Sequence, residues 1–399
     1  MKIYLIVGEP SGDILASRLI KAIRNQRPDA QFFGIGGETM RAEGFDSLFD
    51  IKILSVMGIM EVIPRLPMIL RRRKEILNDI KRVQPDVIVT VDSWGFVDSL
   101  LKVLKKRNCQ IPKIHYVAPQ VWAWKKGRAK KVARIVNHLM TLLPYEPPLF
   151  EKYGLPCTFV GHPVIENTAD LQTNISLLRT HTPTSLSNQT SALLSEQAEI
   201  PENARILCVL PGSRHSEVSR LAPIFVKSIK RIEQEIPNLF ILIPSVEAMK
   251  DEINKHFATL DIPYQLITGQ KARYEAFRMS EFALAASGTV SLELSACHTP
   301  HLIAYTFNAL TNKIAELLVK VKYANLINIL ADYPIIPEFV LRNCQSELIA
   351  AEALSFLHYK EKGEIQMMHA NEQLAKLKPI DKLPSKKAAE VVLGVLKSF

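Results

Sequence analysis

Two loops in the second half of the chain combine glycine with groups that bind anions. The first, Pro211–Arg214, reads Pro-Gly-Ser-Arg; it follows an apolar run at residues 205–210, and a helical pattern begins near Glu217. Glycine lets the backbone approach a ligand closely, the free N–H groups of a helix start attract negative charge, and a guanidinium pairs with phosphate oxygens. The loop therefore favours a phosphate site that includes Ser213 and Arg214. An arginine in an ordinary surface turn is the alternative.

The second loop follows the apolar run at residues 282–286. It contains Ser287, Gly288 and Thr289, and Glu293 comes four residues after Thr289. The glycine allows a tight turn, and the two hydroxyls can cap a helix or bind phosphate. A carboxylate one helical turn later can accept both hydroxyls of a ribose. An acid that only complements the helix dipole is the alternative for Glu293.

The first half of the chain offers carboxylates at the ends of apolar runs. Asp92 follows the run at residues 87–91, where a carboxylate that faces a ligand can act as a general base. Capping of the next helix is the alternative for Asp92. The loop after the first apolar run contains Glu9, Ser11 and Asp13. Because its acids would repel a pyrophosphate and the GxGxxG spacing is missing, this loop suits the hydroxyls of a sugar, and a hydride-transferring dinucleotide enzyme is disfavoured.

An apolar segment with adjacent cations lies at residues 51–77. Pro64 and Pro67 argue against one continuous helix here, and Arg71–Lys74 are all basic. A buried core segment that ends in a charged helix is one interpretation, and an acyl-chain groove or membrane-facing strip is the other. The residues that would contact acyl chains or membrane are Val56, Met57, Ile59, Met60, Ile63, Leu66, Met68 and Ile69.

Short apolar runs alternate with longer segments of helical spacing, which is typical of an α/β fold with parallel sheets. A polar linker at 171–203 interrupts this alternation. We expect two Rossmann-like, doubly wound domains at 1–170 and 204–375, and then, within 376–399, a helix that packs on the first domain or on a partner chain. Strands are expected at residues 2–7, 31–35, 87–91, 113–117, 139–143, 158–160, 205–210, 239–244, 264–267, 282–286 and 301–305.

The composition is that of a globular protein with a basic surface. Of 399 residues, 47% are hydrophobic and 23% charged, and 50 Lys+Arg against 40 Asp+Glu give a net charge of +10. This excludes a disordered chain and favours an anionic partner. The five cysteines include no CxxC pair, so neither a disulfide framework nor a zinc site is expected. Because an apolar run of about 20 residues is missing, we expect a cytoplasmic protein without a spanning segment.

Taken together and in this order, the motifs of the chain resemble those of lipid-A-disaccharide synthases. The similarity covers roughly residues 1–165 and 205–345. It rests on Gly8-Glu9-x-Ser11-Gly12-Asp13, Gly34-x-Gly36-Gly37-x-x-Met40, Val56-Met57-Gly58-x-x-Glu61, Tyr116-Val117-x-Pro119-x-Val121-Trp122-Ala123-Trp124, Pro144-x-Glu146, Phe159-Val160-Gly161-His162-Pro163, Leu210-Pro211-Gly212-Ser213-Arg214, Ser287-Gly288-Thr289 with Glu293, and Asn328 with Pro337-Glu338.

The resemblance implies a GT-B arrangement, with two Rossmann-like domains facing across a cleft, and an inverting glycosyltransferase. Such an enzyme joins UDP-2,3-diacylglucosamine to 2,3-diacylglucosamine 1-phosphate through a β-1,6 linkage and releases UDP, with no metal, no cofactor and no nucleic acid. It is peripheral on the anionic inner membrane of Gram-negative bacteria, and a homodimer is compatible with it. Asp92 matches the base, and the nucleotide-side residues are Ser213, Arg214, Ser287, Gly288, Thr289, Glu293 and Asn328.

One loop and one further position depart from the pattern of this family. Residues 92–97 read Asp-Ser-Trp-Gly-Phe-Val where Asp-x-Pro-Asp-Phe-Asn is usual, and Leu341 replaces a common Gln. The nearest alternative function is another GT-B sugar-nucleotide enzyme, a UDP-N-acetylglucosamine transferase or a UDP-sugar 2-epimerase, which would need no apolar strip. A nucleic-acid- or membrane-binding protein without catalysis would explain the positive charge but would leave the acidic loop at residues 9–13 unexplained.

Overall fold

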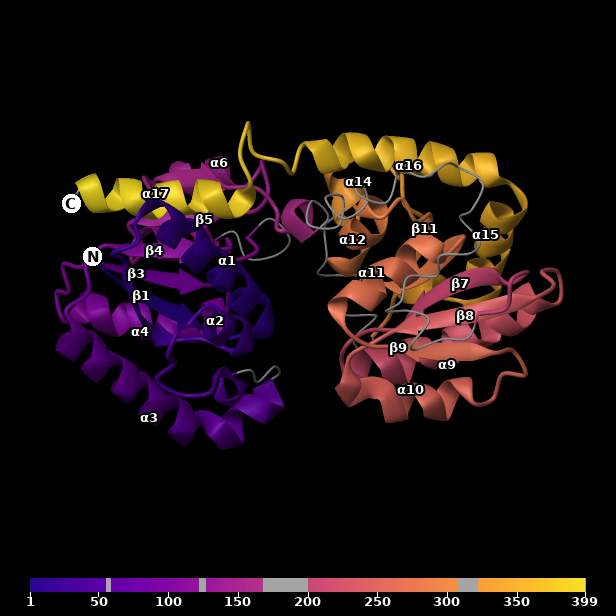
Figure 1. The fold of residues 1–399 in the computed structure, drawn as a ribbon, viewed down its shortest axis with the longest axis horizontal. Helices are drawn as coiled ribbons and strands as arrows, with labels where there is room; N and C mark the ends of the chain where they lie inside the picture. Colours follow the sequence, from indigo (N-terminus) through magenta and orange to yellow (C-terminus); the bar gives the residue numbers. More distant parts are fainter. Residues whose placement is uncertain (55–58, 122–126, 168–199, 308–321, 399) are drawn as a thin grey trace. The chain divides into compact units, whose positions relative to one another are not determined.

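The structure, a computed structural model, describes residues 1–54, 59–121, 127–167, 200–307 and 322–398, without the side chains of residues 52 and 59–65. The chain forms two compact units, Met1–Glu166 with Leu377–Phe399, and Asn167–Lys376. Each unit contains a six-stranded parallel sheet with helices on both faces (Figure 1). The predicted doubly wound α/β fold is therefore confirmed. Most of the expected linker, residues 171–199, lies outside the described residues.

The sheet of the first unit has the strand order β2-β1-β3-β4-β5-β6. Along the inner strand β1, Ile3, Leu5 and Val7 enter one core while Tyr4 and Ile6 enter the other. Both faces of this sheet are buried, which explains why its strands are continuous apolar runs rather than alternating ones. The strands are β1 (Lys2–Val7), β2 (Gln31–Ile35), β3 (Val87–Val91), β4 (Lys113–Tyr116), β5 (His138–Thr141) and β6 (Cys157–Phe159).

Two sets of helices cover the faces of this sheet. One face is covered by α1 (Pro10–Gln26) and α17 (Pro384–Ser398), with the short α2 (Glu38–Ala42) beside α1. The other face is covered by α3 (Ile59–Val83), α4 (Trp94–Lys106), α5 (Gly127–Ala133) and α6 (Pro147–Glu151). None of the helices in the described part of the chain is both long and apolar enough to span a bilayer.

The structure corrects one expectation about the apolar segment. Despite Pro64 and Pro67, α3 is a single helix from Ile59 to Val83. A proline inside a helix removes one backbone hydrogen bond, which is a local loss. The later turns of α3 are held in the core by Ile76, Leu77 and Ile80, and this packing outweighs the two lost bonds.

Helix α17 returns to the first unit after the chain has built the second. Ala388, Ala389 and Val392 pack into the core beneath α1. At its start, Ser385 donates from its backbone N–H and from Oγ to Glu166 Oε1, at 3.0 and 2.5 Å. The last helix is therefore part of the first unit's core.

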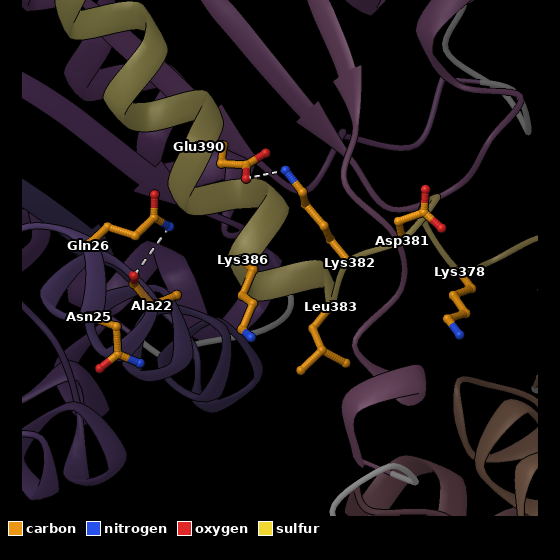
Figure 2. A pocket seen from close by; sticks show the side chains of 9 residues that line it. All are labelled: Ala22, Asn25, Gln26, Lys378, Asp381, Lys382, Leu383, Lys386 and Glu390. Atoms are coloured by element: carbon orange, nitrogen blue, oxygen red, sulfur yellow. Dashed lines mark hydrogen bonds and ion pairs between the residues drawn. The ribbon is translucent and has the colours of Figure 1, made fainter.

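A pocket of about 660 Å³ lies where the segment before α17 passes the end of α1 (Figure 2). Its lining carries both charge signs, and Lys382 pairs with Glu390 at 2.5 Å. Opposite charges at one site largely cancel, so the pocket does not present a strongly basic surface to an anion. The lining residues are Ala22, Asn25, Gln26, Lys378, Asp381, Lys382, Leu383, Lys386 and Glu390.

The sheet of the second unit has the strand order β12-β11-β10-β7-β8-β9. Its strands are β7 (Arg205–Leu210), β8 (Leu239–Pro244), β9 (Tyr264–Ile267), β10 (Phe282–Ala286), β11 (His301–Tyr305) and the unpredicted β12 (Glu338–Val340). One face packs against α9 (His215–Glu233), α10 (Lys250–Phe257) and α15 (Ser346–His358), the other against α11 (Gln270–Met279) and α12 (Val290–Ala296). Helices α14 (Leu326–Ala331) and α16 (Lys360–Ala375) pack beside α12.

Candidate active site

Apart from Asn328 and the apolar strip, the candidate residues follow the strands at which each sheet reverses its strand order. In the first unit β1 leads to β2 on one side while β3 begins the other half, and in the second unit β7 leads to β8 while β10 begins the other half. Ligands of open parallel sheets bind at the carboxyl ends of strands at such a point. Val7 is paired with Val91, and Leu210 with Ala285. The loops that follow these strands are therefore neighbours within each unit.

Asp92 lies in a corner directly after β3. Asp92 and Ser93 both have left-handed backbone, with φ of +53° and +46°, a conformation that is uncommon outside glycine and concentrates at functional sites. The Asp92 carboxylate accepts from Ser11 Oγ at 3.3 Å and from the backbone N–H of Ser93 at 2.8 Å. The cap residue of α4 is Ser93, so Asp92 does not occupy the cap position that the alternative required.

The loop after β1 approaches this corner closely. Ser93 Oγ donates to Glu9 Oε1 at 3.2 Å, and a Cβ on Gly8 would lie 2.6 Å from Ser93 Oγ. Position 8 therefore needs glycine because of this contact. The structure brings Glu9 and Ser11 to the corner formed by Asp92 and Ser93, which lies more than 80 residues away in the sequence.

Asp13 has a different position from its neighbours in the loop. It is buried, and its carboxylate accepts from the backbone N–H groups of Gly37 and Thr39 at 2.6 and 2.8 Å, and from Thr39 Oγ1 at 2.6 Å. Gly37 is the cap residue of α2. The Asp13 carboxylate thus stabilises the N-terminus of α2 and fixes the start of α1 beside it.

Glu146 is a buried carboxyl in the loop after β5, at the same edge of the first sheet. Its Oε2 accepts from the backbone N–H of Leu143 at 3.1 Å. Burial is the main cause that raises the pKa of Glu146 to about 7. The sequence motif included this residue but did not indicate that it is buried.

The loop after β7 exposes Ser213 and Arg214, as a phosphate site requires. Gly212 has φ +124°, in the region that favours glycine. The carboxylate of Glu217, in the first turn of α9, accepts from the backbone N–H of Ser213 at 3.1 Å and from Arg214 Nη1 at 2.8 Å. In the sequence Glu217 marks only the expected start of a helix, because the sequence alone does not show that its side chain turns back.

The loop after β10 presents Gly288 and Thr289 to solvent, with Ser287 half-buried. A Cβ on Gly288 would meet no atom within 4 Å, so this turn has open space beside it. The backbone N–H of Ser287 donates to Ala304 O at 3.0 Å and ties the turn to β11. The loop is therefore held at its base and open at its tip.

Glu293 is held by two residues of α11. Arg273 Nη2 donates to both carboxylate oxygens at 2.7 and 2.8 Å, and Tyr274 Oη donates to Oε1 at 3.1 Å. Burial raises the pKa of Glu293, whereas the Arg273 charge and the Tyr274 hydrogen bond lower it. Arg273 and Tyr274 could not be predicted from the sequence, because they lie about 20 residues before Glu293 in a segment with no motif.

Asn328 is fully buried on α14. Its Nδ2 donates to Ile336 O and to Glu338 Oε1, both at 2.8 Å, and its Oδ1 accepts from the backbone N–H groups of Ile335 and Ile336, both at 2.9 Å. An amide side chain has no further hydrogen-bonding capacity. Asn328 therefore organises the segment that leads into β12.

The apolar strip is described in part. Val56 and Met57 lie outside the described residues, and for Ile59, Met60 and Ile63 only the helical backbone is described. Along the rest of the strip the side chains of Leu66 and Leu70 are 47% and 43% exposed, and Met68 and Ile69 are half-buried. Exposed leucines one turn apart form an apolar surface on α3, next to Arg71.

No group of three or more His, Cys, Asp or Glu side chains that could hold a metal ion occurs among the residues that the structure describes. The described cysteines, Cys109, Cys157, Cys208, Cys297 and Cys344, form no disulfide.

Similar solved structures belong to sugar-nucleotide enzymes. A UDP-GlcNAc 2-epimerase from Neisseria meningitidis matches with a TM-score of 0.64 over all of both chains at 11% identity. The spinosyn rhamnosyltransferase SpnG matches with a TM-score of 0.55 over all of both chains, also at 11% identity. At this identity the likeness shows the fold, which these two classes of enzyme share.

Sequence comparison is more specific. The family model described as lipid-A-disaccharide synthetase matches residues 3–392. The lipid-A-disaccharide synthase of Paramagnetospirillum magneticum is 40% identical over all of this chain and 98% of its own length, and that of Rickettsia akari is 36% identical over 98% and 95%. Together with the fold and the site at the two switch points, these matches show that the chain belongs to the lipid-A-disaccharide synthase family.

Proposed function

We propose that the chain joins UDP-2,3-diacylglucosamine to 2,3-diacylglucosamine 1-phosphate, with inversion, to give the β-1,6-linked disaccharide 1-phosphate and UDP. The observation that carries this proposal is the Asp92 carboxylate, held in a left-handed corner at the switch point of the first sheet. Inversion by direct displacement needs one base on the acceptor side. Asp92 takes that role, in a chain whose family is named for this product.

On the acceptor side, Asp92 removes the proton of the 6-hydroxyl as its oxygen attacks the anomeric carbon of the donor. Ser11 Oγ and the backbone N–H of Ser93 each donate to the carboxylate, which orients it before the acceptor binds. Glu9 and Ser11 offer further polar atoms to the acceptor sugar. Asp13 stabilises this loop because its carboxylate accepts hydrogen bonds from backbone N–H groups at the start of α2.

On the nucleotide side, the bond from the anomeric carbon to the diphosphate breaks and UDP leaves with developing negative charge. Arg214 and the backbone N–H of Ser213 stabilise that charge, together with the start of α9. Ser287, Gly288 and Thr289 give a second set of donors at the neighbouring strand end. Their open turn suits a phosphate or the uridine.

Glu293 accepts the ribose hydroxyls in this proposal, and the charge of Arg273 opposes the rise in the pKa of Glu293 that burial causes. Asn328 contributes indirectly, because its amide fixes the segment that leads into β12.

The acyl chains of both substrates make a membrane surface the natural place for the reaction. We assign the exposed leucines of α3, with Arg71 beside them, to contact with acyl chains or with an anionic membrane. The protein would then be peripheral on the cytoplasmic side of the inner membrane.

The proposed function is tested by product analysis. Purified protein is incubated in detergent and EDTA with both substrates, and the lipid products are examined by mass spectrometry. The proposal predicts a disaccharide 1-phosphate that requires both substrates. A second incubation contains UDP-N-acetylglucosamine alone. Its conversion to the 2-epimer, with no disaccharide formed in the first incubation, would instead favour an epimerase, the activity named for one similar structure.

A further inference from the structure

Glu217 occupies the donors that a nucleotide diphosphate needs. Its Oε1 accepts from Arg214 Nη1 at 2.8 Å and its Oε2 from the backbone N–H of Ser213 at 3.1 Å. The side chain of Glu217 is 14% exposed, whereas that of Arg214 is 54% exposed. A carboxylate thus lies in the loop, bound by a guanidinium and a backbone amide as a phosphate would be.

The loop is shaped around this side chain. A Cβ on Gly212 would lie 2.5 Å from Glu217 Cβ and 2.7 Å from Oε2. Because position 212 has no side chain, the backbone of the loop can lie close to the Glu217 carboxylate. A diphosphate could approach the same backbone atoms for the same reason. The two anions therefore compete for one set of donors.

We propose that Glu217 is an internal competitor of the diphosphate. Its carboxylate holds Ser213 and Arg214 in the empty enzyme, is displaced when the donor nucleotide binds, and returns as UDP leaves. Two negative groups cannot share these donors without repulsion, so the carboxylate weakens UDP binding and speeds product release. This inference rests on the proposed function, because it takes the loop after β7 as the diphosphate site.

A purely structural role predicts the opposite. A glutamate in the first turn that reaches back to the backbone before the helix resembles a capping box. If Glu217 only held the loop in shape, its loss would misplace Ser213 and Arg214, and UDP would bind more weakly. The sign of the change in UDP affinity therefore separates the two roles.

The test is UDP binding, measured by calorimetry on the full chain, for Glu217→Gln, which keeps the size and an acceptor oxygen but removes the charge. We expect the Kd for UDP to fall by about fivefold, the ratio that corresponds to 1 kcal/mol of lost repulsion, and the gain to shrink in high salt. Inhibition of turnover by UDP should strengthen to the same extent. Glu233→Gln, at the other end of α9, makes the same charge change and should leave the UDP affinity unchanged.

Unchanged or weaker UDP binding by a folded Glu217→Gln variant would overturn the inference. If that variant does not fold, Glu217→Ala serves instead: it removes the carboxylate and its charge altogether, so UDP should bind more tightly than to the wild type, and weaker binding would again reject competition. Arg214→Ala separates this from failure of the proposed function. If Arg214→Ala leaves UDP affinity unchanged, the loop is not the nucleotide site; if it weakens UDP binding while Glu217→Gln does not tighten it, only the competitor role is wrong.

Discussion

At the residue scale, the candidate side chains fall into two groups. Some are at least partly open to a ligand, among them Asp92, Ser213 and Arg214. Others are bound inside the protein, as Asp13 and Asn328 are. Residues of the second group hold those of the first in place. The family motifs therefore include structural residues as well as residues that can contact a ligand.

Arg214→Ala tests the nucleotide side directly. Loss of the guanidinium removes charge-assisted hydrogen bonds to the diphosphate, worth about 1.5–3 kcal/mol, so UDP affinity should fall about 10- to 100-fold. Calorimetry with UDP measures this. Arg231→Ala removes an exposed arginine that pairs with Glu347, and it should leave UDP affinity unchanged; equal effects of the two variants would reject the assignment.

Glu146 predicts a pH dependence of stability. Burial raises its pKa to about 7 in the folded protein, so the folded state holds a proton that the unfolded chain loses above its ordinary pKa. The stability from this group is present below about pH 4.5 and is lost as the pH rises through about 7. Glu146→Gln should therefore raise the free energy of unfolding at pH 8 by up to about 3 kcal/mol, with little change at pH 4.5. Urea unfolding at both pH values measures this, and a gain of equal size at both would contradict it.

At the element scale, the sequence predicts the strands better than the helix ends. Ten of the strands begin and end within one residue or so of the apolar runs, for example β3 at Val87–Val91, because a strand buried on both faces is nearly all apolar. The short β12, with Glu338 at its start, has no such run and was missed. Helix α3 was expected to break at its prolines, since the sequence does not show how firmly its later turns pack.

Helix α17 gives a prediction at this scale. Val392 is fully buried in the core beneath α1, and Val392→Ala removes two methyl groups from it. The free energy of unfolding of the first unit should fall by about 2 kcal/mol, which urea unfolding can measure. Lys397→Ala, at an exposed position of the same helix, should change stability by less than about 0.5 kcal/mol; a similar loss in both variants would mean that α17 is not a core element.

The exposed apolar strip on α3 gives a second prediction at the scale of single elements. The double variant Leu66→Ser, Leu70→Ser should lower binding to vesicles of anionic phospholipid by about tenfold, because two apolar side chains no longer enter the membrane. Sedimentation with the vesicles measures the bound fraction. Leu348→Ser is a control in the second unit, where the side chain is 44% exposed. If the double variant binds the vesicles as well as the wild type does, the apolar strip does not contact the membrane.

At the scale of the whole molecule, each of the two units has a parallel sheet, and the loops with most of its candidate polar residues follow the strands at the switch point of that sheet. This much follows from the sequence, because motifs stand at the ends of apolar runs. What the sequence could not show is which side chains meet across long separations, such as Ser11 with Asp92 or Arg273 with Glu293. Nor could the apolar pattern of the last helix identify the surface on which it packs.

The role of Asp92 as the base of a glycosyl transfer can be tested with a single variant. Asp92→Asn keeps the shape of the side chain but cannot take up a proton at neutral pH. UDP affinity and acceptor-dependent release of UDP from UDP-2,3-diacylglucosamine are measured on the same preparation. Asp98→Asn, which changes an aspartate that pairs with Lys102 on α4, is the matched control and should behave as the wild type. We expect Asp92→Asn to bind UDP as the wild type does and to turn over at least about 100-fold more slowly, whereas turnover at the wild-type rate would show that Asp92 is not the base.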